Sequence, residues 1–61
     1  MKNFIEVTNS ASGRKEFISV GSIVRIVPTK DNKTFIQLLG NINNTIDAYE
    51  TYADVKKMIT G

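Results

Sequence analysis

The absence of every residue that could cross-link a small domain is the feature that most constrains this chain. It has 61 residues with no Cys and no His, which excludes a disulfide framework, a thiolate metal site and a structural zinc site. A domain this short buries only about 60% of its unfolded surface on folding. Because neither a disulfide nor a bound soft metal can add stability, burial of surface against a second copy is the remaining source, and we expect the chain to act as a homo-oligomer.

Short apolar runs rich in β-branched residues dominate the sequence and favour strands over helices. Ile, Val and Thr together supply 19 of the 61 residues, and turn-forming Gly, Asn and Ser separate the runs. The predicted fold is one mainly β domain over residues 1–61, a β-rich α+β class with about five short antiparallel strands in a bent sheet or partly open small barrel. The expected strands cover residues 3–8, 14–20, 24–29, 34–39 and 45–50.

Alternation along these strands predicts which side chains face the core. Ile5 and Val7 point inward from the first strand, and Ile46 and Ala48 point inward from the last. Pro28 lacks a backbone donor and therefore marks the end or the edge of the third strand.

The periodicity changes after residue 50 and predicts a short C-terminal helix over residues 52–59. Thr51 and Asp54 resemble a capping box at its start. A helix this short is unstable alone, so its apolar stripe must dock on the sheet or on a partner chain. The stripe consists of Tyr52, Val55, Met58 and Ile59.

The outward side of the strands carries the candidate binding face. By alternation, its members are Lys15, Phe17, Arg25, Val27, Lys33, Phe35, Gln37, Leu39 and Tyr49. Five of these nine residues are Phe, Val, Leu or Tyr and three are basic, whereas a solvated sheet face is mostly polar. The face is either covered by packing or by a second copy, or it is a nucleic-acid platform of aromatic and basic residues. We favour the interpretation that packing or a second copy covers this face, because so short a chain must bury as much of its apolar surface as it can.

Catalysis and metal binding find no support in the sequence. Without His, the serines have no obvious general base, and no Gly-rich phosphate loop is present. The carboxylates of Asp47, Glu50 and Asp54 are close in sequence. Alternation directs Asp47 outward and Glu50 inward or to the strand end, and Asp54 lies at the start of the helix, so we do not expect them to converge on a metal ion. We expect no enzyme activity and no cofactor.

Two motifs give the chain a family resemblance. Thr34-Phe35-Ile36-Gln37-Leu38 fits the pattern T-x-I-x-L, and Glu50–Ile59 fits E-S-Y-x-x-V-x-x-x-I with Thr51 in place of Ser. Together with the segments Phe4–Thr8, Gly13–Val20 and Ile23–Pro28, this order resembles the small flagellar and swarming-motility proteins of the FlbD type. The strand order is also similar to part of the LytTR-type DNA-binding domain. The FlbD-type resemblance implies a sheet of short strands followed by a terminal helix, and a role in binding other proteins.

The function expected from these features is that of a non-enzymatic interaction or adaptor module acting as a homo-oligomer, with another protein as a possible partner. One alternative is a nucleic-acid-binding module that uses Phe17, Phe35, Tyr49, Arg25 and Lys15. A further alternative is a phage or host accessory protein that binds a small anionic ligand at a subunit interface. The longest purely apolar run is two residues, so we expect a cytoplasmic protein with no membrane segment.

Overall fold

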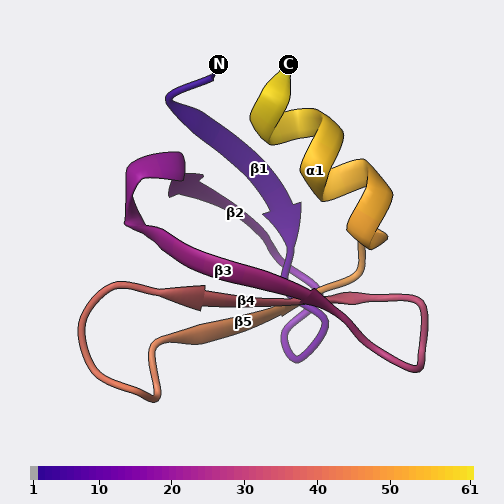
Figure 1. The fold of residues 1–61 in the computed structure, drawn as a ribbon. Helices are drawn as coiled ribbons and strands as arrows, with labels where there is room; N and C mark the ends of the chain where they lie inside the picture. Colours follow the sequence, from indigo (N-terminus) through magenta and orange to yellow (C-terminus); the bar gives the residue numbers. More distant parts are fainter. Residues whose placement is uncertain (1) are drawn as a thin grey trace.

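The computed structural model describes residues 2–61 and confirms a mainly β domain with a short C-terminal helix (Figure 1). All paired strands are antiparallel. The elements in chain order are β1 (Phe4–Thr8), β2 (Lys15–Ser19), a 3-10 turn (Val20–Ser22), β3 (Ile23–Pro28), β4 (Thr34–Leu38), β5 (Thr45–Ala48) and α1 (Tyr52–Thr60).

The five strands form two sheets that are not closed into a barrel. β1 and β2 form a hairpin in which Ile5 lies opposite Ile18. β3, β4 and β5 form a three-stranded meander with β4 in the centre. The chain therefore adopts a bent two-sheet arrangement, in which β1 and β2 are the edges of one sheet and β3 and β5 are the edges of the other.

A corner joins the two sheets where the end of β1 meets the end of β5. Asn9 forms an isolated antiparallel bridge with Ala48. On either side of it, the Tyr49 N–H donates to the Thr8 carbonyl at 2.9 Å and the Ser10 N–H donates to the Asp47 carbonyl at 2.7 Å. The sheets thus share hydrogen bonds only at this bend, and their inner faces enclose one core.

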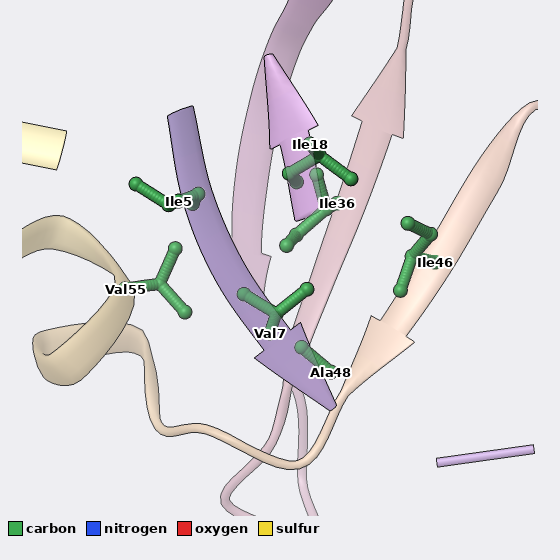
Figure 2. Close-up of a cluster of buried hydrophobic side chains, with 7 residues drawn as sticks. All are labelled: Ile5, Val7, Ile18, Ile36, Ile46, Ala48 and Val55. Carbon is green, nitrogen blue, oxygen red and sulfur yellow. The ribbon is translucent and has the colours of Figure 1, made fainter. Parts of the chain in front are cut away.

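The core is small and apolar, and α1 contributes to it (Figure 2). Val55 points from α1 toward Ile5 and Val7 of β1, and all three side chains are buried. The predicted inward orientation of Ile5, Val7, Ile46 and Ala48 is confirmed. The buried apolar residues are Ile5, Val7, Ile18, Ile36, Ile46, Ala48 and Val55.

Simple alternation fails in β3 because the strand contains an irregularity. The register with β4 shifts between Ile23 and Arg25, as happens when a bulge inserts one residue. Ile23 and Ile26 both pack against the core although they are three positions apart. Val24, between them, is exposed.

Several strand ends differ by one or two residues from the predicted ranges. Val20, expected to end the second strand, instead begins the 3-10 turn. β5 ends at Ala48 rather than at residue 50, because the backbone turns away from β4 once the Tyr49 N–H bonds to β1 at the corner. β3 starts and ends one residue earlier than expected, and α1 continues to Thr60.

Both ends of α1 are capped, and the cap at its start is the one that the sequence predicts. The Thr51 Oγ1 accepts a hydrogen bond from the Asp54 N–H at 3.2 Å. At the other end, Gly61 adopts φ 79° and its N–H donates to the Lys57 carbonyl, a conformation that favours glycine. These local bonds fix the length of a helix too short to be stable alone.

Replacing Thr51 by Ala should lower the free energy of unfolding by about 1 kcal/mol, because the first turn of α1 loses its side-chain acceptor. Urea denaturation followed by circular dichroism measures the change. Thr51→Ser is the matched control, since it keeps the hydroxyl group and should retain most of the stability. An equal loss in both variants would mean that the cap is not the cause.

Candidate interaction surfaces

The outer face of the three-stranded sheet brings together most of the residues predicted to form the binding face. In the strand register, Arg25 lies beside Gln37 and Gln37 beside Thr45, and Val27 lies beside Phe35 and Phe35 beside Asp47. Lys33 and Tyr49 extend these rows at the next position along the strands. We call this surface the meander face, and its residues are Arg25, Val27, Lys33, Phe35, Gln37, Thr45, Asp47 and Tyr49.

Specific contacts order the basic and aromatic side chains of the meander face. The Arg25 Nε donates to the Gln37 Oε1 at 3.0 Å. The Lys33 Nζ lies 4.9 Å from the centroid of the Tyr49 ring, a cation–π geometry. Tyr49 is nonetheless 51% exposed. The face therefore presents a positioned guanidinium group and a positioned aromatic ring to solvent.

Asp47 adds a negative charge to the meander face from the edge strand β5. It lies directly beside Phe35 in the strand register and is exposed. Sequence alternation directs Asp47 outward, but its charge opposes that of the basic residues around it. The surface is consequently mixed in charge rather than uniformly basic.

A second exposed aromatic surface lies on the outer face of the β1–β2 hairpin. Phe4 and Phe17 stack with their ring centroids 5.1 Å apart and an interplanar angle of 8°, and Phe17 is 69% exposed. Lys15 is on the same strand as Phe17. Lys15 and Phe17 are thus not on the meander face. Six of the nine predicted residues lie on that face, two lie on the hairpin, and Leu39 lies on neither.

Two further apolar side chains, Leu39 and Ile42, are exposed outside these faces. Leu39 follows the end of β4, where its N–H donates to the Ser22 carbonyl, and its side chain is exposed. Ile42, in the loop between β4 and β5, is 80% exposed. Phe4 was not among the predicted residues, although alternation in the first strand places it outward with Glu6.

The predicted helix stripe docks on its own chain. Val55 is fully buried, and Met58 and Ile59 pack against the core cluster. Tyr52 is half-buried, and the Lys56 Nζ lies 5.7 Å from the centroid of its ring. Of the two docking sites that the sequence allowed, the structure places the stripe on the sheet of the same chain.

The Glu50 carboxylate serves a structural contact. Its two oxygens accept hydrogen bonds from the Thr8 N–H at 2.8 Å and from the Thr8 hydroxyl at 3.0 Å. Within residues 2–61, no group of three or more acidic side chains is placed to hold a metal ion. Over the same residues, no helix has the length and apolar character needed to cross a bilayer.

Comparison with known proteins gives no match to a protein-family model, to a curated protein or to a solved structure. The FlbD-type resemblance therefore remains a hypothesis based on the residues that carry it. Function must be argued from the exposed surfaces themselves.

Proposed function

We propose that this chain is a non-enzymatic interaction module that self-associates and binds another protein through the meander face. The observation that carries the proposal is the composition of that face. The face carries the exposed Tyr49 and Arg25 and the half-buried Phe35, and aromatic residues and Arg are the side chains enriched in protein interfaces and their hot spots.

The mixed charge of the meander face favours a protein partner over a nucleic acid. A surface that binds phosphates is basic along its length. Here Asp47 lies beside Phe35, the ring on which a base would stack. A carboxylate at that position repels a phosphate backbone but can pair with a basic side chain of a protein.

Self-association is supported by where the apolar surface lies rather than by how much surface there is. The chain exposes 4262 Å², close to the ~4,000 Å² expected for a folded monomer of this mass. The subunit is therefore compact without a partner. Four of the seven exposed large apolar side chains within residues 2–61 lie on the outer faces of the two sheets, where a second copy could cover them; they are Phe4, Phe17, Val27 and Tyr49.

A photocrosslinking amino acid at Phe35 should capture one specific protein in the cells that encode this chain. The same group at the 80% exposed Ile42, outside the meander face, is the matched control. The captured protein is then purified and titrated against the wild type and Tyr49→Ala. We expect the variant to bind about tenfold more weakly or worse, since loss of a hot spot has effects of this size. Equal capture from both positions, or unchanged affinity, would overturn the assignment of the face.

Single-stranded nucleic acid is the second candidate ligand, because the Lys33 ammonium lies over the Tyr49 ring and Arg25 lies on the same face. Fluorescence anisotropy with a labelled oligothymidine at low salt tests it directly. Binding that weakens steeply with salt, and that Arg25→Ala and Lys33→Ala both reduce, would replace the protein partner with a nucleic acid. No binding at low salt would leave the protein partner as the proposal.

A further inference from the structure

One edge of β2 has no strand beside it. Two hydrogen bonds frame the hairpin, from the Asn9 N–H to the Arg14 carbonyl at 2.8 Å and from the Val20 N–H to the Asn3 carbonyl at 2.9 Å. Because bonding alternates along an antiparallel strand, the even-numbered residues of β2 bond to β1. The backbone N–H and C=O groups of Lys15, Phe17 and Ser19 therefore point to the open side. Within residues 2–61, β2 pairs with no strand other than β1.

The edge strand β3 of the three-stranded sheet is protected against pairing in a way that β2 is not. β3 contains the register irregularity near Val24, and it ends at Pro28, which has no N–H to donate. Bulges and proline are two of the devices by which proteins block unwanted strand addition. β2 is regular over all five residues, and its only charged side chain on the outer face, Lys15, is at its end.

We propose that two copies of this chain pair antiparallel through their β2 edges, about a two-fold axis at Phe17. The inference rests on the self-association proposed above and assigns its interface. In this register Phe17 lies opposite Phe17 of the second copy, and Lys15 lies opposite its Ser19. All three pairs are of the hydrogen-bonded type, so every open N–H and C=O group of Lys15, Phe17 and Ser19 gains a partner.

Charge disfavours two of the alternative symmetric registers, and aromatic packing favours the axis at Phe17. An axis at Lys15 would place two ammonium groups opposite each other, and an axis at Glu16 would do the same with two carboxylates. The axis at Phe17 brings the two most exposed rings together. With the stacked Phe4 of each copy, they form a row of four aromatic rings on one side of a four-stranded sheet.

This interface leaves the meander face free. It uses the backbone of β2 and the outer side of the hairpin, whereas the meander face belongs to β3, β4 and β5. A dimer built in this way would present two copies of the meander face to a partner protein. The two surfaces can consequently be tested separately.

Ser19→Pro tests the pairing without disturbing the hairpin. Ser19 has φ −76°, which proline adopts without strain, and its N–H lies on the open side of β2. The substitution removes one donor from each copy, so two hydrogen bonds of the dimer are lost. We expect the dimer dissociation constant to rise about tenfold or more, measured by analytical ultracentrifugation. Circular dichroism should show an unchanged fold, and Ser19→Ala, which keeps the N–H, should remain a dimer.

A charge exchange tests the register itself. Ser19→Lys places an ammonium group opposite Lys15 of the second copy at two symmetric positions and should weaken the dimer. Adding Lys15→Glu to Ser19→Lys converts both contacts into opposite-charge pairs and should restore it. If the wild type is a dimer that Ser19→Pro leaves intact and the double variant fails to rescue, the β2 interface is wrong although self-association stands. A wild type that stays monomeric at millimolar concentration would overturn self-association itself.

Discussion

Replacing Ile36 by Ala is expected to lower the free energy of unfolding by about 2–5 kcal/mol, the usual cost of truncating a buried Ile. Ile36 is fully buried at the centre of β4, where it lies between Ile26 of β3 and Ile46 of β5. No other position in the core has apolar strand neighbours on both sides in this way. A domain of this length has a total stability of about 3–9 kcal/mol, so the variant should lose a large fraction of it.

Thermal and urea unfolding of Ile36→Ala measure this effect, with Ile42→Ala as the matched control. Ile42 is the same residue type but is 80% exposed, and its truncation should change stability by no more than about 0.5 kcal/mol. Equal unfolding midpoints for the two variants would contradict the description of the core.

Replacing Glu50 by Gln should have the second largest effect, a loss of about 1–3 kcal/mol of stability. Glu50 connects three parts of the chain. Its carboxylate accepts from the Thr8 N–H and hydroxyl at the end of β1, and its carbonyl accepts from the hydroxyl of the buried Thr34 at 2.8 Å. Gln has only one side-chain oxygen, so one of the two Thr8 donors loses its acceptor in a partly buried position.

A double-mutant cycle with Thr8→Val isolates this contact. Thr8→Val removes the hydroxyl bond, so Glu50→Gln should cost less in that background, with a coupling energy of about 0.5–3 kcal/mol. Asp31→Asn, in the exposed turn between β3 and β4, makes the same kind of change in side chain and should be nearly neutral. Strict additivity of Thr8→Val and Glu50→Gln would show that the carboxylate does not hold β1.

The parts of the fold that local rules control could be predicted from the sequence. Alternation identified Ile5 and Val7 as core residues because each strand has a clear apolar side. The start of α1 could be located because capping by Thr51 requires only residues within one helical turn. Pro28 marked the end of β3 because proline cannot donate to the ladder.

The features that depend on distant residues could not be predicted. Nothing local marks the irregularity beside Val24, which shifts Ile23 and Ile26 onto the same side. The corner between β1 and β5 depends on which strand ends meet in space. At that corner the strands bend into two separate sheets. Alternation along each strand does not reveal this bend, so it assigned Lys15 and Phe17 to a face that they do not share with Tyr49.

The sequence predicted which residues of the candidate surfaces face outward, but not which of them lie side by side. The outward position of Phe4 follows from the same alternation that identified Ile5, but its partner Phe17 is found only through the register of the hairpin. Asp47 was predicted to face outward, yet its place beside Phe35 depends on the pairing of β4 with β5. This placement makes the meander face mixed in charge and a better fit for a protein than for a nucleic acid.

The corner also determines the order in which the chain can fold. The hairpin and the meander each pair strands that are close in sequence, so both can form early. The contact between Thr8 and Glu50 joins residues 42 positions apart, and closing a loop of that length costs more entropy than closing the short loops of the hairpin and the meander. We therefore expect the corner to form after the hairpin and the meander, and until it forms the inner faces of the two sheets are exposed to solvent and to neighbouring chains.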